Sequence, residues 1–71
     1  MLPEKICNQV INVSYKSCIF DYQLNNDIES IVNEFYKAID DDQFCKAKGV
    51  LKALELIDII NHIKDAKKDS K

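Results

Sequence analysis

The fold is decided by residues 27–66, which read DIESIVNEFYKAIDDDQFCKAKGVLKALELIDIINHIKDA. Apolar residues recur in this stretch every three or four positions, which is the spacing of one face of an α-helix. The run of acids from Asp40 to Asp42 interrupts the pattern, and Asp favours the start of a helix over its interior. The stretch predicts a helical hairpin, with a short helix over about 27–39 and a long helix over about 42–66.

We expect the two helices of this hairpin to pack on each other. Asn26, followed three residues later by Glu29, has the spacing of a capping box at the start of the short helix. Gly49 lies inside the long helix, where a glycine often marks the close approach of another backbone, here that of the short helix. The residues predicted to pack within the hairpin are Ile28, Ile31, Val32, Phe35, Phe44, Ala47, Gly49, Leu51 and Leu54.

The C-terminal half of the long helix carries a second apolar stripe, rotated by about a third of a turn from the first at 100° per residue. A short helix of about 20 Å cannot cover both stripes. The second stripe must therefore face the N-terminal segment, another copy of the chain or another protein. The residues predicted to form a partner interface are Phe20, Tyr22, Ala53, Leu56, Ile57, Ile60 and Ile63.

Residues 1–24 allow two interpretations. Pro3 suits the first turn of a helix, whereas the apolar residues between Cys18 and Leu24 alternate along the chain with the spacing of a strand. We expect a helix over about 3–16 and an extended segment over about 18–24, and the pattern leaves open whether residues 11–24 are strand or helix. The chain is then a mainly α single domain over 1–71. Residues 1–24 are its candidate partner-binding arm, and residues 67–71 are a frayed charged tail.

The composition is that of a small globular protein. The chain has 71 residues, of which 46% are hydrophobic and 31% are charged, with one Gly and one Pro, which argues against disorder and against a turn-rich β-sandwich. No apolar run reaches the length of about 18 residues that a membrane span needs. The first residues lack the pattern of a secretory signal, so we expect an intracellular protein.

The charge is divided between the two halves of the chain. Residues 1–42 sum to −5 and residues 43–71 to +3, and all ten basic residues are Lys. The absence of Arg argues against a sequence-specific nucleic-acid reader, and the Lys-rich end could give only weak phosphate contact. Opposite charges of this kind can attract each other within the hairpin or between neighbouring copies.

The reactive side chains form no recognisable site. Cys7, Cys18 and Cys45 are widely spaced and are expected to be free thiols, and with His62 they lack the close ligand pairs of structural zinc sites. The single His has no nucleophile placed beside it by the sequence. We therefore expect no enzyme, no catalytic, cofactor-binding or metal-binding residue, and no cofactor.

Residues 41–56, DDQFCKAKGVLKALEL, resemble a segment of small helical proteins from tailed bacteriophages and prophages. The shared features are an acidic turn, a helix with a basic residue before Gly49, and the pair Ala53-Leu54, within a resemblance that extends over about residues 41–66. Proteins of that kind are virion or virion-assembly components, so the resemblance implies an assembly role without an active site. It also implies a location in the host cytoplasm, with the virion as a further location.

Three functions remain open from the sequence. The leading one is a non-enzymatic structural protein, a minor virion or head-assembly component that oligomerises or docks on a larger protein through its helices. The alternative is a small acidic inhibitor or immunity-type protein that masks a basic surface of another protein. Both imply a protein partner or self-association, and neither needs nucleic acid or a membrane. The third is a nucleic-acid accessory protein that acts through the Lys-rich tail, which the composition disfavours.

Overall fold

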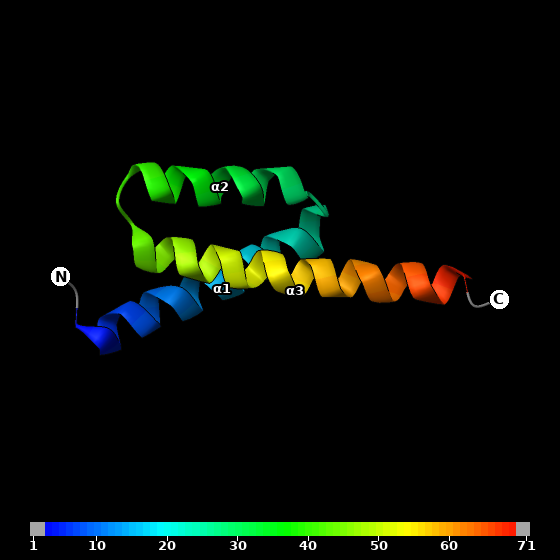
Figure 1. Cartoon of the computed structure of the whole chain (residues 1–71), viewed down its shortest axis with the longest axis horizontal. Coiled ribbons are helices and arrows are strands. Elements are labelled where there is room, and N and C mark those ends of the chain that lie inside the picture. Colours follow the sequence, from blue (N-terminus) through cyan, green and yellow to red (C-terminus); the bar gives the residue numbers. More distant parts are fainter. Residues whose placement is uncertain (1–2, 70–71) are drawn as a thin grey trace.

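A computed structural model describes the backbone of residues 3–69 and the side chains as far as Asp65. It contains three helices: α1 over Glu4–Asn25, α2 over Ile28–Asp40 and α3 over Phe44–Asp69 (Figure 1). The predicted mainly α fold with a hairpin of a short and a long helix, here α2 and α3, is confirmed. Strands are absent from the 67-residue stretch between Pro3 and Asp69.

The predicted extended segment over 18–24 is wrong, because α1 continues through it without a break to Asn25. The residues at 4–25 are also not a separate arm, since α1 packs along α3. The alternation that suggested a strand has a helical explanation. Cys18 and Tyr22 lie on the buried side of α1, whereas Phe20 and Leu24 lie on an exposed side, about half a turn away at 100° per residue.

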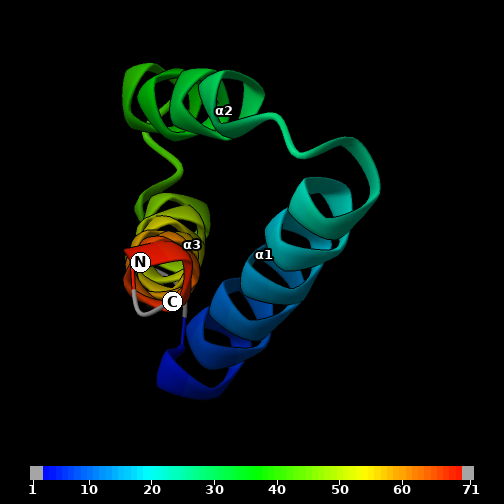
Figure 2. The ribbon, with the colours of Figure 1, turned by 90° about the vertical axis from the view of Figure 1, so that its right-hand side faces the viewer.

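The three helices form an elongated molecule of 51 × 22 × 17 Å. The helices α1 and α3 run in the same direction, and α2 returns between them along the chain (Figure 1). Both α1 and α2 pack on α3 but hardly touch each other. The view along the long axis shows α1 and α2 on different sides of α3. A short turn joins the end of α1 to the start of α2 (Figure 2).

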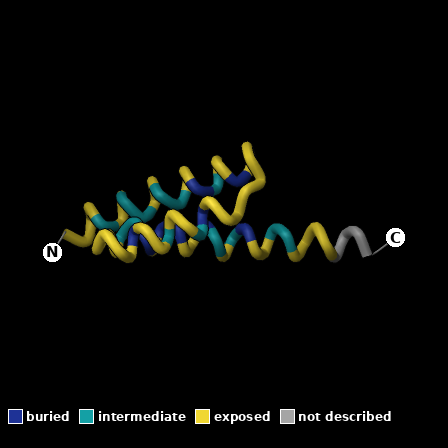
Figure 3. The backbone as a smooth tube through the Cα atoms, turned by 90° about the horizontal axis from the view of Figure 1, so that it is seen from above, coloured by how far each residue is buried: buried dark blue, intermediate teal, exposed yellow. Residues whose placement is uncertain are grey.

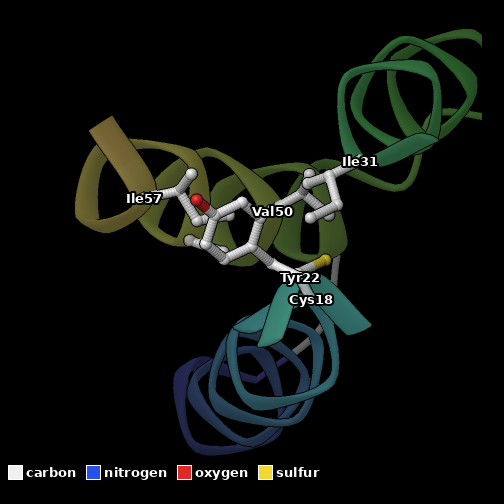
Figure 4. Packing of buried hydrophobic residues seen from close by; sticks show 6 residues of the cluster. Cys18, Tyr22, Ile31, Val50 and Ile57 are labelled. Atoms are coloured by element: carbon white, nitrogen blue, oxygen red, sulfur yellow. The ribbon is translucent and has the colours of Figure 1, made fainter. Parts of the chain in front are cut away.

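The core lies where α3 passes between the other two helices, and its buried residues follow the middle of the molecule (Figure 3). Cys18 and Tyr22 reach from α1 toward Val50 and Ile57 of α3, and Ile31 enters from α2 (Figure 4). The buried hydrophobic side chains are Cys18, Tyr22, Ile31, Ala38, Ala47, Val50, Ala53 and Ile57. A core this small leaves each of its members important for stability.

The residues predicted to pack within the hairpin divide into three groups. Ile31, Ala47 and Gly49 are buried, and Val32, Phe35 and Leu54 are partly buried. The prediction is wrong for the remaining three, one on α2 and two on α3, which are exposed, whereas Val50 of α3 is fully buried. The exposed residues are Ile28, Phe44 and Leu51.

The turn between α1 and α2 uses its two residues differently from the predicted capping box. Asp27, and not Asn26, is the N-cap of α2, where Ser30 donates to it from its backbone N–H at 3.4 Å and from its hydroxyl at 2.7 Å. Asn26 instead ends α1 in the left-handed conformation, with φ of 55°, and its N–H donates to the carbonyl of Tyr22. Asn tolerates that conformation better than most residues other than Gly.

The acidic run forms the connection between α2 and α3. It is not part of the first turn of the long helix, as was predicted. Asp40 ends α2, Asp42 takes a left-handed φ of 58°, and α3 begins only at Phe44. The N–H of Gln43 donates to the carbonyl of Ala38 at 2.8 Å, which closes the turn. At its other end α3 continues to Asp69, three residues past the predicted end, so the predicted frayed tail is helical over 67–69, and its last two residues lie outside the described part.

Gly49 marks a close helix crossing, but the partner is α1 and not the short helix. A Cβ on Gly49 would lie 2.8 Å from Cβ of Ser14 and closer still to the carbonyl oxygen of Ile11. Real Cβ atoms do not approach other atoms this closely, so the crossing requires Gly. The sequence indicated the close approach correctly and assigned it to the wrong helix.

A disulfide joins Cys7 near the start of α1 to Cys45 near the start of α3, with 5.4 Å between the two Cα atoms. The prediction of three free thiols is therefore wrong for this pair, and Cys18 is a free and buried cysteine. The bond could not be expected from spacing, since its ends lie 38 positions apart in the sequence. It depends on α1 running in the same direction as α3, which brings the two helix starts together.

Candidate protein-interaction surface

Three polar contacts fix how α1 lies on α3. The hydroxyl of Tyr22 donates a hydrogen bond to Oδ1 of Asn61 at 2.5 Å. Lys52 Nζ lies 4.8 Å from the ring centroid of Tyr15, and Lys64 Nζ lies 5.9 Å from that of Tyr22. Together with the disulfide, these contacts hold α1 from its first turns to its last, so the surface that α1 presents outward is fixed in orientation.

A groove with a volume of about 500 Å³ opens between α1 and α2. Its floor is apolar, because Cys18, Ile31 and Val50 from three different helices meet there. The groove exists because α1 and α2 each pack on α3 and make few contacts with each other. Its walls also include Val13, Ser14, Ser17, Asp21, Asn25, Asp27, Ser30, Glu34 and Lys46.

The charged side chains that line this groove are mainly acidic. Asp21 stands on α1, and Asp27 and Glu34 stand at the N-cap and in the middle of α2, whereas Lys46 is the single cation among the lining residues. Lys46 Nζ lies 3.4 Å from Oε2 of Glu34, an exposed pair that stabilises little by itself. The groove therefore keeps a negative excess that suits a basic partner.

Two groups in the groove titrate away from their usual ranges. Burial raises the pKa of the Cys18 thiol, and the carboxylates of Glu34 and Asp21 raise it further. The Ser30 hydroxyl and backbone N–H lower the pKa of Asp27. The thiol therefore remains protonated and packs as a small apolar side chain, and not as a nucleophile.

An exposed apolar stripe on α1 borders the groove. Val13, Phe20 and Leu24 have 68%, 63% and 69% of their surface exposed, which is high for large apolar side chains. Val13 also lines the groove, so the stripe and the groove are continuous. Contiguous exposed apolar surface of this kind is typical of protein-binding sites.

A second hollow surrounds the disulfide at the other end of the molecule. It lies between the first turns of α1 and the start of α3, where the exposed Phe44 stands beside Cys45. Cys7, Val10, Asp42, Gln43 and Lys46 complete its lining. It offers an apolar surface and a bonded disulfide but no pair of groups that could perform chemistry.

The structure places the predicted interface residues in different environments. The prediction is wrong for Tyr22, Ala53 and Ile57, which are buried in the chain's own core. Leu56 and Ile60 are partly buried, and Phe20 and Ile63 are exposed. The second apolar stripe of the long helix was expected to face the N-terminal segment, another copy of the chain or another protein. In the structure the N-terminal helix α1 covers part of this stripe.

Sequence reasoning missed Val13 and Leu24 as surface apolar residues. The signal was present in the helical spacing of residues 6–24, where a second apolar stripe lies beside the one that packs on α3. Dividing this segment into a helix and a strand hid the stripe, because its two halves were assigned to different elements.

The described side chains bring no metal-binding cluster together. Between Pro3 and Asp65, no group of three or more His, Cys, Asp and Glu residues could hold a metal ion. His62 is exposed on α3. No described helix has both the length and the apolar character needed to cross a bilayer.

Comparisons with protein-family models, with curated proteins and with solved structures find no match to this chain.

Proposed function

We propose that this chain is a non-enzymatic assembly protein that works by presenting a fixed helix surface to another protein. The observation that carries the proposal is the exposed apolar stripe of α1 around Val13, Phe20 and Leu24. Keeping such side chains in water costs free energy that a partner would recover by burying them. The stripe stands on a folded helix that a disulfide and Tyr22 hold in place, so binding needs little further ordering.

The test compares proteins retained by the immobilised chain with those retained by a double variant, Phe20→Glu with Leu24→Glu. The matched control is Asn8→Glu with Asn12→Glu, which adds the same charge to exposed positions about a third of a turn away from the stripe on α1. We expect a protein, or the chain itself, to bind the wild type and the control but not the stripe variant. If no bound protein depends on the stripe, the proposed function is wrong.

The finer form of the proposal is a minor virion or head-assembly component of a phage. It is supported only by the resemblance of residues 41–56 to small helical proteins of tailed phages. Its test is the purification of particles from an induced source strain. The chain should be found in virions or in head-assembly intermediates at a fixed ratio to the other proteins.

A second candidate function is an acidic inhibitor that masks a basic surface. The observation that favours it is the groove wall of Asp21, Asp27 and Glu34. Such binding should be lost above about 0.3 M salt, because exposed charges are then screened, whereas binding through the apolar stripe should persist. Replacing Asp21 and Glu34 by Asn and Gln should weaken it, whereas Phe20→Glu, which leaves the groove carboxylates in place, should not.

A further inference from the structure

The exposed stripe of α1 has the spacing of a coiled-coil seam. Its members follow one another at alternating steps of four and three residues, as the a and d positions of a heptad repeat do. Ile6, Val13, Phe20 and Leu24 in this series are exposed, and Val10 is partly buried. The seam consists of Ile6, Val10, Val13, Ser17, Phe20 and Leu24.

The seam is distinct from the surface by which α1 packs on α3. Cys18 and Tyr22 form the buried surface, together with the Ile11 carbonyl group and the Ser14 Cβ that lie against Gly49. On the helical wheel the centres of the two surfaces are separated by about a third of a turn. The helix α1 is therefore apolar on two sides, and α3 covers only one of them.

We propose that a second copy of this chain covers the seam, with the two α1 helices pairing side by side and in parallel. This inference rests on the proposed function and names its partner. In a parallel pair, the residue just before an a position faces the residue five places later in the other helix. Lys16 and Asp21 stand in this relation, so each Lys16 would face Asp21 of the other copy, twice in the symmetric pair.

The antiparallel arrangement lacks this complementarity. With the same apolar layers, it would bring Lys16 opposite Lys16 of the other copy and would leave Asp21 without a cation. Like charges in such flanking positions disfavour one orientation and opposite charges favour the other. The charges along α1 therefore select the parallel pair.

The groove supports the same orientation. Asp21 lies both beside the seam and in the groove wall, with Asp27 and Glu34 across from it on α2. In the parallel pair, the side of the second α1 that carries Lys16 lies toward this wall. The partner's ammonium group would thus enter a site lined by three carboxylates and one cation, Lys46.

The seam spans just under three heptads, a length at which isolated peptides pair weakly because they must also become helical. Here α1 is already folded, since Cys7 is bonded to α3 at one end of the helix and Tyr22 contacts α3 at the other. Association therefore does not bear the cost of ordering the helix. Ser17 at a central a position limits the apolar area and helps to fix the register.

Sedimentation of the purified chain over a wide range of concentration tests the pairing. We expect a reversible monomer–dimer equilibrium, which Phe20→Glu should weaken by about a hundredfold or more, since it removes a large apolar side chain from both copies. Asn12→Glu adds the same charge to an exposed polar position of α1 and should leave the equilibrium unchanged. A monomer at every concentration would overturn the inference, as would a dimer indifferent to Phe20→Glu.

The orientation is tested in a Cys18→Ala background, which removes the free thiol. Ser17→Cys should then form a disulfide between copies, because residue 17 faces itself in a parallel pair and faces residue 13 in an antiparallel one. Lys16→Asp should weaken the dimer, and adding Asp21→Lys should restore it. A dimer that forms without the Ser17→Cys bond, or without rescue by the double exchange, would contradict the parallel arrangement.

These results separate the inference from the proposed function. If the chain is a monomer yet retains a different protein through Phe20 and Leu24, the inference fails and the proposed function stands. If nothing binds through the stripe, both fail.

Discussion

The hydroxyl of Tyr22 on α1 donates a hydrogen bond to Oδ1 of Asn61 on α3, with 2.5 Å between the two oxygen atoms. Tyr22 is buried and Asn61 is partly buried, so neither group can exchange its partner freely for water. Tyr22→Phe should lower the free energy of unfolding by about 1 kcal/mol, measured by urea denaturation. Tyr36→Phe, at an exposed tyrosine, is the control and should change it by less than about 0.5 kcal/mol. Equal effects of the two substitutions would show that the hydrogen bond adds nothing.

Gly49→Ala should destabilise the chain although Ala favours helices. The added methyl group would meet the Ile11 carbonyl and Ser14 Cβ, and overpacking of this kind costs about 1–3 kcal/mol. The gain in helix propensity offsets about 1 kcal/mol of that cost. Lys48→Ala, at the exposed neighbouring position, should stay within about 0.5 kcal/mol of the wild type in the same denaturation experiment. A more stable Gly49→Ala variant would mean that α1 and α3 do not cross closely at this point.

Breaking the bond between Cys7 and Cys45 should cost about 4 kcal/mol, because it closes a loop of 38 residues in the unfolded chain. Denaturation with and without a reductant measures this difference. The double variant Cys7→Ser with Cys45→Ser should match the reduced protein, and Cys18→Ala should still respond to the reductant. Finding three titratable thiols in the oxidised protein would contradict the bond.

Asp27→Ala should destabilise α2 at neutral pH, because Asp27 accepts the two hydrogen bonds from Ser30. These bonds lower the pKa of Asp27 in the folded chain. The stabilisation is therefore complete above the ordinary pKa of an Asp, and it is lost as the pH falls through the lowered value. Thermal unfolding should show the difference between wild type and Asp27→Ala shrinking in acid. Asn also caps a helix but does not titrate. The difference in thermal stability between Asp27→Asn and Asp27→Ala should therefore not shrink in acid.

The Cys18 thiol should react slowly with alkylating reagents at neutral pH. Burial raises its pKa, and Glu34 and Asp21 raise it further, so little thiolate forms and the sulfur is inaccessible. In urea the rate should rise to that of an ordinary cysteine. The raised pKa also means that the folded state loses stability as the pH rises above the ordinary value, because the unfolded thiol then ionises first. A fast reaction in the native chain would indicate that the groove floor is open to solvent.

The hairpin could be predicted from the sequence because it rests on local signals. The spacing of apolar residues in 27–39 gives one well-defined face, and an acidic run separates it from the long helix. The cap was misassigned by one residue, because Asn26 and Asp27 are both good caps and only the backbone conformation decides between them. Boundaries of this kind depend on where the chain turns, which propensity does not fix.

The position of α1 could not be predicted, since it depends on contacts between residues far apart in the chain. Gly49 indicated a close crossing, yet nothing local states which helix crosses there. The two apolar sides of α1 together resemble strand alternation around Phe20 and Tyr22, so its second half was interpreted as extended. The same misassignment hid the exposed stripe, which is visible only when residues 6–24 are treated as one helix.

The link between Cys7 and Cys45 places both interhelical turns inside one covalent ring. A protease that cut once between Asn26 and Asp27, or between Asp41 and Gln43, would open this ring without releasing either fragment. The nicked chain would keep the mass of the intact one plus a water molecule and would come apart only on reduction. A chain cleaved at either turn would therefore remain a single covalent molecule for as long as this disulfide is oxidised.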